Sequence, residues 1–324
     1  MIIKVVFLIF LYLLMYTASS TIVLGSYLFG KNKEIMDIVK IYFTNLLNIT
    51  YQIGFNSNLY YSGSYIKSNN IDIIISNHIN TIDFTLNIVI SNYFDERGYN
   101  FLISKHVTYL PGIGFLMSSS TDIKLNKNLL DDKNNIINSI KKIKNGIIIL
   151  FPEGTRFTSE KHKLAVEYSK KNNLPIFKNT LYPKMKGLHL IINILRERNK
   201  LGNLIDLTHY IKNNKTYMKD MLKENIGNTY SVINTYNIPK DNSLENYDNF
   251  KSWFLQIWTK KDNILDNIKP YNYKKLPVKI NLIYLIITIL VIVFYVFINI
   301  KTKGKYFLVT LFLSYLITII RNLR

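Results

Sequence analysis

Hydrophobic positions in this chain follow two patterns, long uncharged runs near both ends and short apolar runs between them. The first long run, Val5–Phe29, has 25 residues without a charge. As a helix it would reach about 37 Å, which is enough to cross a bilayer. Two further runs, Ile280–Ile300 with 21 residues and Tyr306–Ile320 with 15, lie near the other end. The basic turn Lys301–Lys305 separates them, so we expect a helical hairpin there.

The long runs divide the chain into an N-terminal membrane anchor at 1–30, a central domain at 31–279 and a C-terminal transmembrane hairpin at 280–324. A cleaved signal peptide is the alternative for the first part, because Lys4 precedes the run and Ala18–Ser20 resembles a cleavage site. The run continues well past that site, which favours a retained anchor. Lysines lie on both sides of the spans and leave membrane sidedness open.

The central domain alternates short apolar runs with amphipathic segments. Its β-branched and apolar runs predict strands at Ile71–Ser76, Phe101–Ser104, Ile123–Asn126, Ile147–Phe151, Leu204–Leu207 and Ser231–Tyr236. Helical spacing of apolar residues predicts helices at Leu130–Lys144 and Leu244–Asn267. This alternation predicts an α/β fold with a mostly parallel sheet flanked by helices. Ligands of such sheets bind where loops leave the carboxyl ends of the strands.

Charge and composition narrow the classes of function. The chain has 41 Lys and Arg against 21 Asp and Glu, a net charge of +20, of which the central domain holds +14. Such a balance indicates an anionic partner, either nucleic acid or a phospholipid surface. The basic residues are spread along the chain without a nucleic-acid-binding motif, so the apolar ends favour the phospholipid bilayer and no nucleic acid. The chain has no cysteine, which excludes disulfides, Cys-ligated zinc and thiol nucleophiles.

One polar loop follows the predicted strand at 71–76. In it, His78 lies five residues before Asp83, and Asn80 is placed to cap a helix that has Asp83 at its third position. A carboxylate that folds back onto an imidazole fixes its tautomer and suits the histidine to act as a general base. The alternative is a structural loop histidine, with Asp83 only a favourable charge at a helix start.

A second polar loop, Phe151–Phe157, follows the predicted strand at 147–151. Gly154 allows close approach of the backbone, Thr155 offers a hydroxyl group, and Arg156 presents a planar fork suited to phosphate. The alternative is a turn held by an ion pair between Glu153 and Arg156. The joint occurrence of the two loops after apolar strands is more specific than either loop alone.

These residues resemble the membrane-bound lysophospholipid and glycerophosphate acyltransferases. The family signature is Asn-His, four residues, then Asp, and Glu-Gly-Thr-Arg some 70–80 residues later, as at His78, Asp83 and Glu153–Arg156. The resemblance is strongest to the branch with 1-acylglycerol-3-phosphate and lysocardiolipin acyltransferases. Further matches to that branch are Phe151–Thr158, Lys161-His162, Leu174-Pro175, Pro183–Gly187, Leu204–Thr208 and the Trp253–Asp262 segment.

The resemblance implies acyl transfer from acyl-CoA, a co-substrate, to a hydroxyl group of a lysophospholipid, with no resident cofactor and no metal. It assigns His78 as the general base and Asp83 as the residue that orients it. Residues assigned to the acceptor phosphate or the substrate pocket are Glu153, Gly154, Thr155, Arg156, Lys127 and Lys105. Lys127 is a departure, because the family has arginine there, and it keeps the charge without the bidentate fork.

The acceptor that this resemblance favours is 1-acylglycerol-3-phosphate, which would give phosphatidic acid. Other lysophospholipids, lysocardiolipin or glycerol 3-phosphate are alternatives within the same chemistry. A lipid-binding scaffold that has kept the fold without the activity is the alternative from another class. The expected location is an integral, multi-pass position in a membrane, of the endoplasmic-reticulum type if the source is a eukaryote or a virus of eukaryotes.

Overall fold

The computed structural model describes residues 57–109, 122–126, 129–213, 227–239, 241–268, 271–277 and 300–306, with single positions such as Tyr217 and Ile286 between them. The predicted anchor at 1–30 and most of the predicted hairpin at 280–324 lie outside these residues. No helix of the described part is both long and apolar enough to cross a membrane. The predicted spans and domain limits therefore stay predictions.

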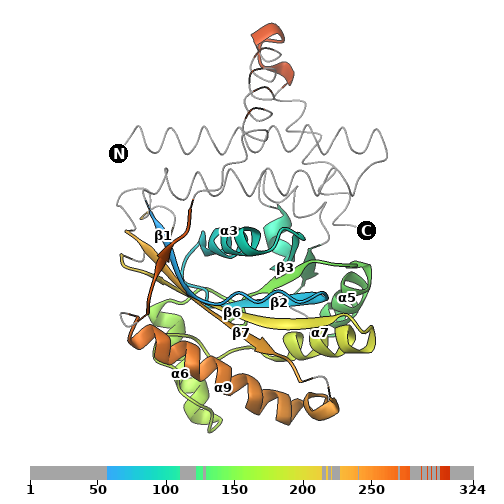
Figure 1. The fold of residues 1–324 in the computed structure, drawn as a ribbon, viewed down its shortest axis with the longest axis vertical. Helices are drawn as coiled ribbons and strands as arrows, with labels where there is room; N and C mark the ends of the chain where they lie inside the picture. Colours follow the sequence, from blue (N-terminus) through green and yellow to red (C-terminus); the bar gives the residue numbers. More distant parts are fainter. Residues whose placement is uncertain are drawn as a thin grey trace.

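The described residues form one eight-stranded sheet with the order β4-β3-β5-β2-β6-β7-β1-β8 (Figure 1). Five strand pairs are parallel, and the two antiparallel pairs are β6 with β7 and β1 with β8. The strands are β1 Leu59–Gly63, β2 Ile71–Ser76, β3 Tyr99–Ser104, β4 Ile123–Leu125, β5 Ile147–Leu150, β6 Leu201–Ile211, β7 Thr229–Asn237 and β8 Lys274–Lys275. The predicted α/β class with a mostly parallel sheet is thus confirmed.

Helices cover both faces of this sheet (Figure 1). They are α3 Asp83–Phe94, α5 Leu129–Lys142, α6 Ser159–Lys171, α7 Lys186–Glu197 and α9 Tyr247–Asp266, with short 3₁₀ turns η2 Lys105–Tyr109 and η3 Asn242–Leu244. The predicted helices at Leu130–Lys144 and Leu244–Asn267 correspond to α5 and α9. Helices α6 and α7 and strands β1 and β8 were not predicted.

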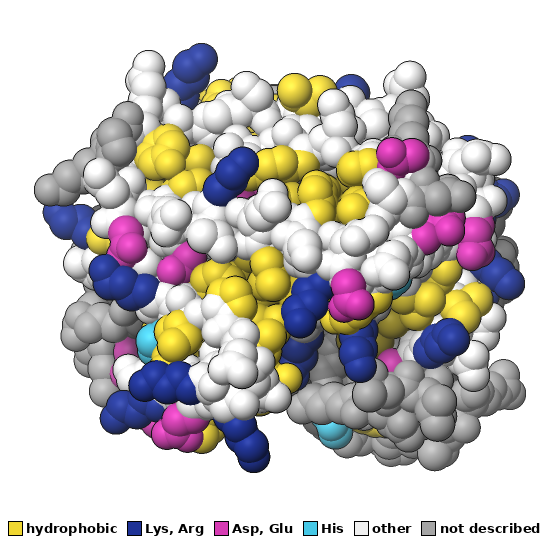
Figure 2. Space-filling view, turned by 90° about the horizontal axis from the view of Figure 1, so that it is seen from below, with side chains coloured by type: hydrophobic (Ala, Val, Ile, Leu, Met, Phe, Trp, Pro, Cys, Tyr) yellow, Lys and Arg dark blue, Asp and Glu magenta, His cyan; other side chains and the backbone are white. Residues whose placement is uncertain are grey.

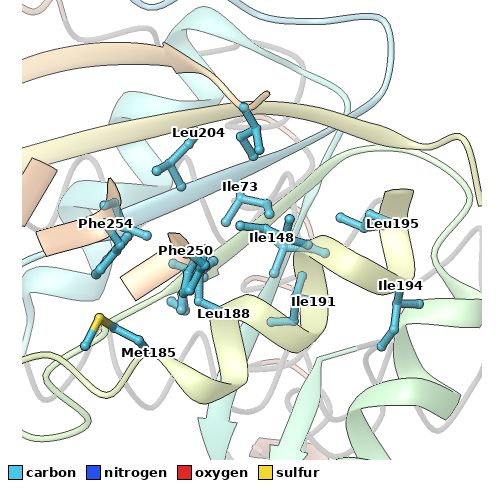
Figure 3. Packing of buried hydrophobic residues seen from close by; sticks show 14 of the residues in the cluster. Ile73, Ile148, Met185, Leu188, Ile191, Ile194, Leu195, Leu204, Phe250 and Phe254 are labelled. Carbon is cyan, nitrogen blue, oxygen red and sulfur yellow. The ribbon is translucent and has the colours of Figure 1, made fainter. Parts of the chain in front are cut away.

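The two faces of the sheet carry separate hydrophobic cores. On one face, α3 packs Leu86, Val89 and Ile90 against β2, β5 and β6. On the other face, α5, α7 and α9 pack against the alternate residues of the same strands. There the strand residues Ile73, Ile148 and Leu204 lie in one cluster with Leu188 of α7 and Phe250 of α9 (Figure 3). Because residues on a strand alternate between faces, a central strand covered on both sides is buried throughout: β5 is entirely apolar, and β2 is apolar except for Asp72 and Ser76.

Charged side chains of both signs lie on the side opposite α3. Figure 2 shows lysine and arginine side chains there between acidic and hydrophobic ones. Among the described residues on this face, basic side chains are therefore interspersed with acidic and hydrophobic ones (Figure 2).

Candidate active site

The two predicted loops leave neighbouring strands at the same edge of the sheet. Strands β2 and β5 are parallel, and Ile75 pairs with Leu150. Residues 77–82 and 151–157 follow directly, so the pairing brings them side by side. The backbone closes the contact, because the Phe157 N–H donates to the His78 carbonyl at 2.7 Å. This is the edge at which a ligand of an α/β sheet is expected.

His78 and Asp83 form the predicted pair. Nδ1 of His78 lies 2.9 Å from Oδ2 of Asp83, which is fully buried, while the His78 side chain is 22% exposed. The same carboxylate oxygen accepts the backbone N–H groups of Ile79 and Asn80 at 2.6 and 3.1 Å. A carboxylate so held accepts a hydrogen bond from Nδ1–H, which leaves Nε2 as the basic nitrogen. No hydrogen bond to Nε2 is found among the described residues.

The helix after this loop begins later than the sequence indicated. Asp83 is the first residue of α3 and Ile82 occupies the cap position, so the predicted cap at Asn80 with Asp83 third in the helix is wrong. The Asn80 side chain instead accepts the Ile82 N–H at 3.0 Å. Local turns formed by an asparagine side chain compete with the regular helix. The Asp83 carboxylate still folds back onto the loop, where it accepts the Asn80 N–H.

Phe151 covers the imidazole of His78. The two rings are stacked, with centroids 4.4 Å apart and planes 26° from parallel. Phe151 was noted in the sequence as part of a motif, without a role of its own. The contact restricts the tilt of the imidazole, so Phe151 and Asp83 together fix the direction in which Nε2 points.

Glu153 ties the two loops to a third segment. This buried carboxylate accepts the His78 backbone N–H at Oε1 (2.8 Å) and the Leu181 N–H at Oε2 (3.0 Å). Burial raises its pKa to about 8, an effect opposed by both hydrogen bonds and by the cation of Lys261. Glu153 therefore braces the backbone, and the alternative of a turn-closing ion pair with Arg156 is wrong.

The next three residues shape the rim of the site. Gly154 has φ of +66°, a left-handed conformation that favours glycine. The Thr155 hydroxyl accepts a hydrogen bond from Lys161, and the Arg156 guanidinium donates to Thr81 in the other loop. Arg156 also lies over the Tyr217 ring, 5.4 Å from its centroid. The guanidinium is thus held beside the loop that carries His78.

The two predicted lysines have different outcomes. Lys105 starts η2, directly after β3, whose carboxyl end lies at the same edge because β3 is parallel to β5. Lys105 also acts on Lys124 in β4. The pKa of Lys124 is lowered mainly by burial, and the positive charges of Lys142 and Lys105 lower it further. Lys127 lies outside the described residues, so its place in the site stays a prediction.

The sequence assigned no role to several residues that the structure brings to the site. The groups involved are the hydroxyl of Thr81, the backbone N–H of Leu181 and the ammonium group of Lys161. Groups of these kinds are common along the chain, so the sequence alone does not single them out. Only the fold brings them to the two loops. In the described part of the chain, no group of three or more His, Cys, Asp or Glu side chains is arranged to hold a metal ion.

The comparisons with known proteins agree with this geometry. A family model described as Acyltransferase matches residues 59–188, which include both loops. The 1-acyl-sn-glycerol-3-phosphate acyltransferase delta of Homo sapiens is 25% identical over 196 residues, 59% of this chain and 51% of the relative. The 1-acyl-sn-glycerol-3-phosphate acyltransferase 3 of Arabidopsis thaliana is 31% identical over 148 residues, 44% of this chain and 39% of the relative. The matches thus span about half or less of these relatives.

A solved structure has a similar fold. The 1-acyl-sn-glycerophosphate acyltransferase PlsC of Thermotoga maritima superposes with a TM-score of 0.50 at 13% identity, covering 82% of this chain and 98% of that protein. At this identity the likeness concerns the fold alone. The family match, both motifs and their meeting at one edge of the sheet are consistent with one another. Residues 59–188 of this chain match the Acyltransferase family model, and both loops lie within that match.

Proposed function

We propose that this protein is an acyl-CoA-dependent O-acyltransferase that esterifies 1-acylglycerol-3-phosphate to phosphatidic acid. The observation that carries the proposal is the 2.9 Å contact between His78 Nδ1 and the buried Asp83 carboxylate, at the strand edge beside Arg156. The named activity of the matched relatives supports the choice of acceptor. Phospholipid synthesis or remodelling is the corresponding process.

In the proposed reaction, Nε2 of His78 removes the proton from the acceptor hydroxyl while the hydroxyl oxygen attacks the carbonyl carbon of the thioester. The tetrahedral intermediate collapses as its carbon–sulfur bond breaks. The thiolate of CoA leaves and takes the proton from Nε2, which returns His78 to its starting state. Asp83 stabilises the transient imidazolium, and such general-base help is worth about 10²–10⁴-fold in rate. The reaction uses acyl-CoA as co-substrate and needs no resident cofactor.

The acceptor phosphate is assigned to Arg156. Its guanidinium donates to Thr81, three residues from His78, so a phosphate bound by this side chain would lie near the imidazole. Lys105 and Lys127 follow neighbouring strands and would add charge for the same dianion. We place the protein at a phospholipid bilayer, through the apolar runs at both ends, where acceptor and product reside.

An acceptor panel tests this assignment. Purified protein in phospholipid vesicles receives radiolabelled acyl-CoA with 1-acylglycerol-3-phosphate, lysocardiolipin, another lysophospholipid or glycerol 3-phosphate. We expect labelled phosphatidic acid as the main product. Preferential transfer to a different acceptor would contradict the named acceptor, and transfer to none would favour a lipid-binding scaffold.

Arg156→Ala tests the phosphate assignment in the same assay. We expect a higher KM for the acceptor, by about ten-fold or more, since a charged hydrogen bond is worth about 1.5–3 kcal/mol. Lys163→Ala is the matched control, because this exposed lysine lies on α6. A change confined to the KM of acyl-CoA would count against the role of Arg156.

A further inference from the structure

A segment without helix or strand, Lys178–Leu181, lies between the active-site loops and the last helix, α9. The carboxylate of Asp262 in α9 organises it. Oδ2 accepts the Lys178 N–H and Oδ1 accepts the Asn179 N–H, both at 2.8 Å. Oδ1 also accepts the hydroxyl of Thr180 at 2.9 Å. One buried carboxylate therefore sets three consecutive residues of this segment.

Trp258, one turn earlier on α9, completes the contact. Its indole N–H donates to the Leu181 carbonyl at 3.1 Å, and its ring is fully buried. Asp262 is 6% exposed. Such contacts are not easily replaced by water, because buried polar groups depend on their protein partners. Leu181 is thus held on its carbonyl side by α9.

The N–H of Leu181 points the other way, to the active site. It donates to Glu153 Oε2, while Glu153 Oε1 accepts the His78 N–H. The hydrogen bonds form a continuous path from Asp262 and Trp258, through the 178–181 segment and Glu153, to the backbone of His78. Each step is a contact between buried or half-buried groups.

The charge of Glu153 matters for this path, because only the carboxylate form offers two full acceptors to the two N–H groups. The charged groups that face Glu153 are Asp83 from α3 and Lys261 from α9. Lys261 is itself paired with Asp206 of β6. Burial raises the pKa of Glu153 to about 8, and the Leu181 N–H is one of the contacts that lower it. Loss of that N–H would raise the pKa further.

We propose that Asp262 is a positioning residue for the active site, acting through residues 178–181 and Glu153 on the loop that carries His78. The proposal rests on the function proposed above. Asp262 lies 74 positions beyond the end of the matched family domain at residue 188, so α9 supplies a part of the site that this domain does not contain. Trp258 supports Leu181 in the same way.

Asp262→Asn is the first test, because the amide places N–H groups against the backbone donors of the segment. We expect kcat to fall by about ten- to a hundred-fold, as small displacements of catalytic groups can cost 10²-fold. The KM for acyl-CoA should stay within about two-fold, since no donor contact is removed. Asp266→Asn is the matched control: Asp266 contacts Lys178 and Asn179 at an exposed position, and its variant should keep wild-type kcat.

Trp258→Phe is the second variant and changes no charge. It keeps an aromatic ring in the core and removes the hydrogen bond to Leu181, together with part of the ring that faces Lys261 Nζ at 5.3 Å. We expect the acid limb of the pH–rate profile to move to higher pH. In protein with ¹³C-labelled glutamate carboxyls, the Glu153 resonance, identified by Glu153→Gln, should titrate at higher pH than in the wild type.

The glutamate titration separates this proposal from the proposed function. If the wild type transfers no acyl group, the proposed function fails, yet the Glu153 pKa still reports the path from α9. The proposal is supported if the Glu153 pKa is higher in Trp258→Phe than in the wild type and unchanged in Asp266→Asn. An unchanged Glu153 pKa in Trp258→Phe, or wild-type kcat in a folded Asp262→Asn variant of an active enzyme, would overturn it.

Discussion

At the scale of single residues, the chemistry depends on a carboxylate that cannot move. Asp83 is the first residue of α3 and is fully buried, with one oxygen shared by His78 and two backbone N–H groups. The sequence predicted that His78 and Asp83 would meet, because a spacing of five residues across a helix start allows it. It did not predict Phe151 against the imidazole, since an aromatic residue after an apolar strand is also an ordinary core residue.

Asp83→Asn tests this arrangement at the level of one atom. The amide leaves the size of the side chain unchanged but stabilises the imidazolium less and can select the other tautomer. We expect kcat to fall by about 10²-fold or more, measured with saturating acceptor and acyl-CoA. Asp248→Asn, in the exposed first turn of α9, is the control. Activity near the wild-type level would show that Asp83 does not orient the base.

At the scale of elements, the site depends on where strands end rather than on the loops alone. Strands β2 and β5 were predicted because their sequences are short, mostly apolar and β-branched, and the structure shows both to be fully buried. Helix α7 was missed although Leu188, Ile191, Ile192 and Leu195 have helical spacing. Strand β1 pairs with β7, about 170 residues later, and no local pattern reveals such a partner. The loops could therefore be predicted, but not the 178–181 segment behind them.

Gly154→Ala tests the shape of the loop after β5. A residue with a Cβ atom in the left-handed region costs about 1–2 kcal/mol, and the added carbon would lie 3.1 Å from Cδ of Lys184. We expect a loss of unfolding free energy of that size in chemical denaturation, and lower activity as the loop shifts.

Gly187→Ala is the matched control for this variant. Gly187 lies in the first turn of α7, and a Cβ atom there meets nothing within 4 Å. Alanine is favoured over glycine in a helix by about 0.5–1 kcal/mol, so its stability should be equal or higher. Equal stability of the two alanine variants would contradict the conformational role of Gly154.

At the scale of the whole molecule, helix α9 joins the far end of the described chain to the central sheet. Lys261, fully buried, forms an ion pair with Asp206 in β6 and donates to the Leu207 carbonyl at 2.8 Å. Leu207 pairs with Ser76, at the end of β2 that leads to His78. The sequence predicted α9 only as an amphipathic helix. A lysine and an aspartate on its inner face could not be assigned without the strand opposite them.

Lys261→Met tests how far the molecule depends on this pair. Removing one partner leaves a buried charge without compensation, which costs about 3–5 kcal/mol, measured by chemical denaturation. The double variant Lys261→Met with Asp206→Leu should recover much of that loss, because two apolar side chains replace the pair. A double variant no more stable than the single one would indicate that the cost comes from packing instead of charge.

The most direct test of the central claim compares the wild type with His78→Ala in vesicles, with radiolabelled acyl-CoA and 1-acylglycerol-3-phosphate. The control His106→Ala changes an exposed histidine of η2. We predict that the wild type and His106→Ala form phosphatidic acid. His78→Ala should lose about 10²–10⁴-fold of that rate with an unchanged unfolding transition. A folded His78→Ala variant with the wild-type rate would contradict the assignment of His78 as the base.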